Sequence, residues 1–306
     1  MEKKQFFEEV LKATQEQIPA ELKGIVKVEI AEVLKNNDEK LNGIRMSIEG
    51  NNMMPTLYLE DFFEAYAEGI SIEEIANTII EVCTNAFKNP PPIYDFSFEY
   101  DEIKDKLIVE LIDGDMNQER LSDLVYKEIK CGLVMVPYVT IRDLPIGAMR
   151  TAVTKDMVQK YNYDVDELMD TAFVNTIDNF KPVFIESNFE TDFDIDIKTA
   201  NPMEDTFKID RDGMLYLLTN SEGHYGATVF FYPGVAEKIG QILGKDYYVL
   251  PSSVHEMMIV PKVIGVSPKG LKLLVKDANH TVVDRRDLLS DKVFYYSRKN
   301  SELIAF

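Results

Sequence analysis

The last hundred residues constrain the fold most strongly, because short strand-like and helix-like stretches alternate there. Strands rich in β-branched and aromatic residues are expected at 214–220, 227–233, 246–251, 254–261 and 292–297. One helix starts after Pro233 and stops at Gly244, and a second is capped by Ser267 with Pro268 at its first position. The second helix has an apolar stripe, formed by Leu271, Leu274, Val275 and Ala278. This order predicts a ββαββαβ module in residues 206–306.

The first 89 residues predict an N-terminal α/β unit. It begins with an amphipathic helix whose apolar side carries Phe6 and Val10. The following elements are two paired strands, a short strand and two helices, at residues 24–37, 40–50, 55–60, 61–69 and 71–87. Ser71 and Glu74 form a capping box for the last of these helices, whose inward face is expected to include Val82.

A proline run at 89–93 breaks regular structure and separates this unit from a central α+β region, residues 93–200. The expected elements there are a strand, a helix, a strand and two helices, at 105–112, 117–129, 132–141, 154–162 and 164–180. Pro137 interrupts the second strand, which predicts an edge or a bend. The fold class expected for the whole chain is α+β, with mostly antiparallel sheets, helices packed on one face, and two to three modules.

Composition indicates a globular protein with a substantial core, since 45% of residues are hydrophobic and 28% are charged. No apolar run approaches the roughly 18–20 residues needed to cross a bilayer, and the amphipathic start differs from a signal peptide. The two isolated cysteines, Cys83 and Cys131, form neither a metal knuckle nor a disulfide framework. A cytoplasmic protein of bacterial type is therefore expected, without membrane binding.

Charge is unevenly distributed along this acidic chain, which has a net charge of −20. Residues 231–306 hold eleven Lys and Arg against eight Asp and Glu, a net of +3. The remaining 22 basic and 45 acidic residues give residues 1–230 a net of −23. Such a field repels nucleic acid and anionic lipid. It is more often simply a solvated surface that favours solubility, and the alternative is attraction to a basic protein partner.

Three longer strings resemble a known family. They are "PTLYLEDFFEAYAEG", "VTKDMVQKYNYDVDELMDTAFVNT" and "FFYPGVAEKIGQILGKDYYVLPSSVHEMMIVP". The chain is similar over nearly its whole length to an uncharacterised Firmicute family catalogued as a domain of unknown function, number 5688. The last two strings are also distantly similar to a second uncharacterised Firmicute family, which implies a shared α+β core. The resemblance implies no activity, cofactor or catalytic residue.

The stretch "LPSSVHEMMIVP" is the strongest candidate for catalysis. If 254–260 is a strand, His255 and Glu256 point to opposite faces and cannot cooperate directly as an acid–base pair. Ser252 and Ser253 follow a proline and are typical of a turn, so the favoured interpretation is a hairpin with a hydrogen-bonded histidine. The alternative is a hydrolase-like enzyme that uses His255, with Ser252, Ser253 and His224 in its site.

No metal or cofactor is expected. The three histidines, His224, His255 and His280, lie at least 25 residues apart, without the spacing of a known ligand pattern. "DGDMN" at 113–117 begins like a calcium loop but lacks the glycine and the bidentate glutamate that such a loop needs. Glycine-rich phosphate loops are absent from the sequence.

A row of acidic residues gives a third hypothesis. Asp192, Asp194 and Asp196 alternate with apolar residues, so as a strand they would place carboxylates about 6–7 Å apart on one face. That spacing roughly matches the phosphates of one DNA strand. It predicts either an acidic edge that discourages aggregation or a nucleic-acid mimic that inhibits a DNA-binding protein.

The function favoured by these patterns is a non-catalytic, cytoplasmic protein-binding or regulatory role. The hydrolase and the nucleic-acid mimic stand as alternatives. The sequence leaves the oligomeric state, the partner and the pathway open.

Overall fold

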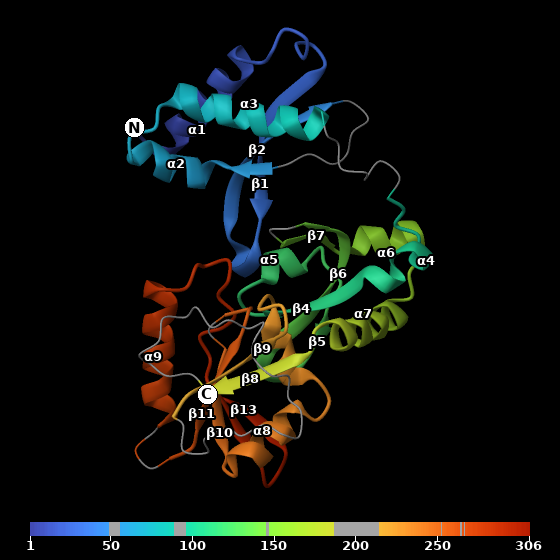
Figure 1. Cartoon of the computed structure of the whole chain (residues 1–306), viewed down its shortest axis with the longest axis vertical. Helices are drawn as coiled ribbons and strands as arrows, with labels where there is room; N and C mark the ends of the chain where they lie inside the picture. The colour runs from blue at the N-terminus through green and yellow to red at the C-terminus, as the bar shows by residue number, and fades with distance from the viewer. Residues whose placement is uncertain are drawn as a thin grey trace. The chain divides into compact units, whose positions relative to one another are not determined.

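The computed structural model describes residues 1–48, 56–88, 96–144, 147–186, 214–251, 253–263, 265 and 267–306. The chain divides into two compact units (Figure 1): Met1–Lys35 with Glu39–Ser97, and Asn36–Asp38 with Phe98–Phe306. Every strand pair within the described ranges is antiparallel, and helices pack against the sheets, so the predicted α+β class is confirmed. Within the described ranges, no helix is long and apolar enough to cross a membrane.

The first unit combines a three-stranded sheet with three helices. Its elements are α1 (Lys3–Glu16), β1 (Val26–Leu34), β2 (Lys40–Ile48), β3 (Thr56–Tyr58), α2 (Leu59–Ala67) and α3 (Ile72–Lys88), and the strand order is β1-β2-β3. The predicted capping box is confirmed, because the Ser71 hydroxyl accepts the Glu74 amide at 3.2 Å and the Glu74 carboxylate accepts the Ser71 amide at 3.0 Å.

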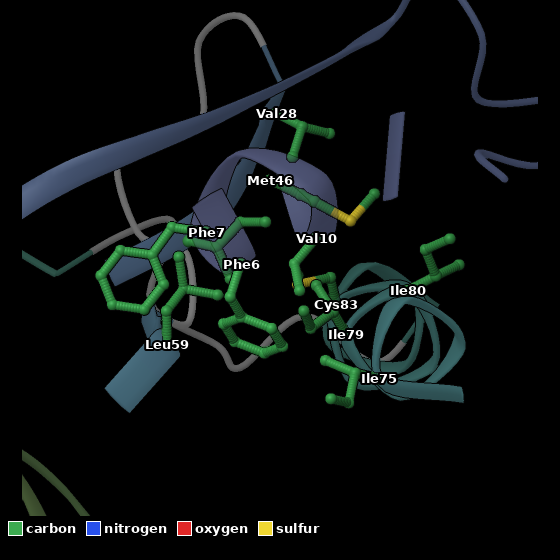
Figure 2. Packing of buried hydrophobic residues seen from close by; sticks show 11 residues of the cluster. Phe6, Phe7, Val10, Val28, Met46, Leu59, Ile75, Ile79, Ile80 and Cys83 are labelled. Carbon is green, nitrogen blue, oxygen red and sulfur yellow. The ribbon is translucent and has the colours of Figure 1, made fainter. Parts of the chain in front are cut away.

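The core of this unit lies between α1, α3 and the sheet. Figure 2 shows Phe6 and Val10 of α1 close to Ile79 and Cys83 of α3. Burial raises the pKa of the Cys83 thiol, which suits an unreactive core residue. Val82 was expected to face inward but is 40% exposed. The buried face of α3 instead carries Ile75, Ile79 and Cys83, which recur every four residues, so that Val82 lies outside it.

The second unit contains a four-stranded and a six-stranded sheet. The four-stranded part comprises α4 (Tyr100–Ile103), β4 (Leu107–Asp113), α5 (Gln118–Leu121), β5 (Lys127–Glu128), β6 (Leu133–Leu144), β7 (Gly147–Ala152), α6 (Lys155–Tyr161) and α7 (Val165–Asn179). The helix predicted over 117–129 is wrong beyond its first turn. Lys127 and Glu128 pair with Met135 and Val134 of β6, and this pairing overrides the local helical pattern.

Pro137 lies in the central strand β6, and not at an edge. It pairs with Val109 of β4 on one side. On the other side, β6 pairs with β5 up to Met135 and with β7 only from Tyr138 onward, so neither strand needs the N–H that proline lacks. The Pro137 carbonyl accepts a hydrogen bond from the Val153 amide at 2.9 Å.

The free edge of β4 is covered by polar side chains of α7. The Thr176 hydroxyl accepts the Val109 amide at 2.9 Å, while the Asn175 side chain donates to the Leu107 carbonyl at 3.0 Å. These bonds occupy backbone groups that would otherwise be open to another strand.

The six-stranded sheet has the order β13-β12-β10-β11-β9-β8. Its strands and associated helices are β8 (Pro182–Glu186), β9 (Tyr216–Asn220), the 3-10 helix η5 (Gly226–Phe231), α8 (Val235–Leu243), β10 (Tyr247–Leu250), β11 (Met257–Pro261), α9 (Pro268–Thr281), β12 (Phe294–Ser297) and β13 (Glu302–Ala305). The strand predicted at 227–233 is wrong, since this stretch forms η5. Ala227, Val229 and Phe230 are all buried. In a stretch that is apolar on every side, the sequence shows neither the two-residue period of a strand nor the 3.6-residue period of a helix.

Helices cover both faces of this sheet. On one face Tyr247 stacks on Tyr296 at 4.9 Å and donates its hydroxyl to the Ala236 carbonyl of α8 at 2.8 Å. On the other face Tyr248 packs with Leu271 and Val275 of α9. In the predicted stripe of α9, Leu274 and Ala278 are exposed, so only half of that stripe is covered.

Candidate functional site

The loop between β10 and β11 carries the serine–histidine stretch. Because β11 begins at Met257, His255 lies in a bend before the strand, and the strand predicted from Val254 starts three residues later. The Val254 amide donates to the Asp287 carbonyl at 2.7 Å, which ties the loop to the segment after α9. His255 is therefore placed by loop contacts, and not by the alternation of a strand.

Both ring nitrogens of His255 are engaged by protein groups. Nε2 lies 3.3 Å from Oδ1 of Asp287, and Nδ1 accepts the Tyr225 amide at 3.1 Å. An acceptor role for Nδ1 places the proton of the neutral ring on Nε2, where it faces the carboxylate. The imidazole thus links three segments that are distant in sequence.

His224 and Tyr225 flank this imidazole, with ring centroids 5.6 Å and 5.3 Å from it. Tyr225 has a φ of 55°, the left-handed conformation that turns the chain sharply at this point. The next residue must be glycine, because a Cβ on Gly226 would lie 2.3 Å from the Thr219 hydroxyl and 2.5 Å from the His255 carbonyl oxygen. The structure therefore brings two predicted site residues, His224 and His255, together.

A buried polar cluster lies close to the histidine pair. Glu110 is 5% exposed and its Oε1 lies 3.3 Å from Nη1 of Arg150, whose guanidinium sits 5.5 Å from the centre of the Tyr225 ring. Arg120 donates to the hydroxyl of buried Tyr138. Burial raises the pKa of Glu110 although both arginines act to lower it, and the charge of Glu110, with burial, raises the pKa of Tyr225 to about 12.

The acidic neighbours of His255 decide its protonation. Burial acts to lower the pKa of His255, but the hydrogen bond and charge of Asp287, with the charges of Glu256 and Glu110, outweigh it, so that the pKa is raised. Burial also raises the pKa of Glu256, against the lowering effects of His255 and of a hydrogen bond from Ser253. The ring thus gains basicity from its surroundings.

Ser253 is the one serine of this stretch within the described ranges, and its hydroxyl is not placed for activation by His255. Oγ of Ser253 accepts the backbone amide of His255 at 3.0 Å. General-base activation needs the hydroxyl on a ring nitrogen, and within the described ranges Asp287 and Tyr225 hold both nitrogens. This arrangement joins loops and holds a proton, and it lacks the geometry of a nucleophile–base pair.

Metal binding finds no support in the described part of the chain, where no group of three or more His, Cys, Asp or Glu could hold an ion. The acidic residues of the incomplete calcium loop have other partners. Lys292 Nζ lies 3.1 Å from Asp113 and 2.8 Å from Asp115, and the Ser290 hydroxyl donates to Asp113 at 2.5 Å.

Some predicted residues fall outside the described ranges. Ser252 is one of them, and so are the three aspartates of the acidic row, Asp192, Asp194 and Asp196. The nucleic-acid mimic therefore stays a prediction, which competition with DNA for a basic protein would test.

The residues around His255 that sequence patterns missed come from scattered positions. They are Glu110, Arg120, Arg150, Tyr225 and Asp287. Glu110 had a visible signal, because it is a carboxylate inside the apolar strand "LIVELI". Arg150 and Asp287 had none, since only the assembled fold brings them to the cluster.

A second candidate site is the outer face of α9, defined here by Lys269, Leu273, Lys276 and His280. These residues recur at spacings of four, three and four, so they form one stripe along the helix. The stripe lies opposite the buried residues Leu271, Val275 and Asn279. All four of its side chains are exposed, and Leu273 is exposed to 72%.

Comparison with known families identifies one match. A family of unknown function (DUF5688) matches residues 3–298. No curated protein and no solved structure matches the chain. Because the matched region covers nearly the whole sequence, the chain belongs to this family of unknown function (DUF5688).

Proposed function

We propose that the chain is a non-catalytic protein-binding or regulatory protein of the bacterial cytoplasm, which contacts its partner through α9. The observation that carries this proposal is the exposure of two adjacent leucines, Leu273 to 72% and Leu274 to 66%. Single exposed apolar residues are ordinary, but two exposed leucines on a helix with just three buried residues leave part of its surface without packing partners among the described residues. Covering such a surface is favourable by roughly 25 cal/mol per Å².

The contacts of His255 support the same proposal from the other direction. Its imidazole is engaged by Asp287 and by the Tyr225 amide, so the residue has a structural task that needs no substrate. Residues 1–230 carry a net charge of −23, which favours a partner that has a basic region in addition to the part that contacts α9.

The test is a nuclease-treated pull-down from host lysate with the full-length protein. Wild type is compared with L273E/L274E and with H255A, and bound proteins are identified by mass spectrometry. We expect one stoichiometric partner that wild type and H255A both retain and that L273E/L274E loses. Equal retention by all three proteins would show that α9 is not the contact surface.

The hydrolase stands as a second candidate because of one observation, the pairing of His255 with Asp287 at 3.3 Å. A carboxylate at Nε2 orients an imidazole that acts as a base, but Nδ1 would have to exchange the Tyr225 amide for a hydroxyl. The test is a screen of ester, amide and phosphoester substrates with wild type and H255A. Turnover that H255A abolishes while it retains the native fold would favour the enzyme.

A further inference from the structure

The outer face of α9 is basic as well as apolar. The helix carries Lys269, Lys272 and Lys276 against a single acidic residue, Asp277. Two of these lysines, Lys269 and Lys276, border Leu273 on the stripe, one turn before it and one turn after it. The surface therefore has an apolar centre with positive charge at both ends.

Within the described ranges, two of these lysines have no carboxylate partner. Among the residues that the structure describes, no carboxylate lies within 4 Å of Lys269 or Lys276. Lys272 instead donates to the backbone carbonyl of Phe306 at 3.0 Å. The ammonium groups of Lys269 and Lys276 are thus available to a partner's carboxylates.

From this geometry we infer that α9 binds an acidic amphipathic segment of a partner protein, whose apolar side covers Leu273 and whose carboxylates meet Lys269 and Lys276. The inference rests on the proposed function and specifies the partner's chemistry. Charge complementarity of this kind fixes register and speeds association, while the apolar contact supplies most of the affinity.

An anionic membrane is disfavoured as the occupant. A helix that lies on a bilayer needs a broad apolar face with large side chains, whereas the two exposed leucines of α9 point about 100° apart and Leu273 lies between cations. Residues 1–230, with a net charge of −23, would also be repelled by anionic lipid. A peptide segment needs only the helix.

The test measures binding of two labelled helical probe peptides to the full-length protein by fluorescence anisotropy. Both probes carry leucines at helical spacing, and the remaining positions are Glu in the first and Gln in the second. Vesicles of mixed phosphatidylserine and phosphatidylcholine form the third arm. The protein variants are K269E/K272E/K276E and a matched control, K4E/K12E/K23E, which changes the net charge equally at exposed lysines of the first unit.

We expect the Glu probe to bind more weakly as salt increases, and to lose roughly tenfold or more in affinity with K269E/K272E/K276E. The control variant should leave its affinity within about twofold. Equal loss in both variants would reduce the effect to total charge and overturn the inference. No binding of the Glu probe, or preference for the vesicles, would overturn it as well.

The Gln probe separates this inference from the proposed function. If Gln and Glu probes bind equally, the acidic partner is wrong, while protein binding through the leucines stands. If lysate capture is independent of Leu273 and Leu274, the proposed function itself fails, whatever the probes do.

Discussion

The surroundings of His255 and the outer face of α9 differ in how far the protein satisfies its own side chains. Around His255, each ring nitrogen has a protein partner, and the ring is packed between His224 and Tyr225. On α9, Leu273 is 72% exposed and faces solvent. The imidazole of His255 is thus held by contacts within the protein, while α9 leaves Leu273 exposed to solvent.

In a chain without a recognisable catalytic motif, this contrast favours exposed surfaces over clusters of polar residues as the place to look for function. Polar residues near one another do not make a site if their hydrogen bonds close on each other. Exposed apolar and charged side chains on a rigid helix retain their interaction energy for a partner.

The largest effect is expected from Arg150, whose loss leaves the Glu110 carboxylate buried without its nearest cation. R150M should lower the free energy of unfolding by about 3 kcal/mol, measured by urea denaturation. The double variant E110Q/R150M removes both charges and should lose less than R150M alone. If the double variant is the less stable of the two, the ion pair is not what holds the cluster.

Gly226 tests how tightly the His255 loop is packed. In G226A the new methyl would overlap the Thr219 hydroxyl and the His255 carbonyl, so the loops must separate. We expect a loss of about 2 kcal/mol in unfolding free energy and faster amide exchange at Tyr225. G244A is a control of different kind, because nothing lies within 4 Å of its new Cβ and the cost there comes from a φ of 65° alone. A stability for G226A equal to wild type would refute the close packing.

His255 should contribute about 1 kcal/mol through its two hydrogen bonds, a contribution that H255Q partly removes. Because the folded pKa is raised above the unfolded value of about 6.5, the stabilisation by protonation is complete below that pH. It is lost as the pH rises through the folded pKa. Urea midpoints of wild type should therefore fall relative to H255Q as the pH rises above about 6.5. A rise instead would mean that the Tyr225 amide bond to the neutral ring dominates.

The smallest effect on stability is expected on α9. L273E/L274E changes side chains that contact little, so its unfolding free energy should stay within about 0.5 kcal/mol of wild type, measured by urea denaturation. L271E, which buries a charge one turn away, is the destabilising counterpart. A large loss in L273E/L274E would show that the outer face is already packed, and the contrast with His255 would disappear.

Local sequence signals predicted many helix limits correctly. Thr154, the first residue of the helix predicted over 154–162, accepts the Met157 amide as its N-cap at 3.1 Å, and Ser267 accepts the Gly270 amide at 3.2 Å. Gly244 ends α8 in the left-handed conformation. These features depend on neighbours within one turn of the chain, so the sequence carries them in full.

Features set by distant contacts were not predictable in the same way. β8 and β13, the two edges of the six-stranded sheet, were not expected, because pairing with β9 and β12 defines them. The candidate site shows the same limit. The sequence identified His224 and His255 as candidate site residues. The partners of the His255 imidazole, Asp287 and the Tyr225 amide, decide what it can do, and they reach it only in the folded chain.

The covering of β4 by α7 has a consequence for how the second unit opens. The Val109 amide is held by the Thr176 hydroxyl of a helix, and not by a neighbouring strand. Its exchange with deuterated solvent therefore requires α7 to leave the sheet edge, while the amides that β4 gives to β6 need the sheet itself to separate. A single backbone proton thus reports detachment of one helix, and distinguishes that motion from unfolding of the whole unit.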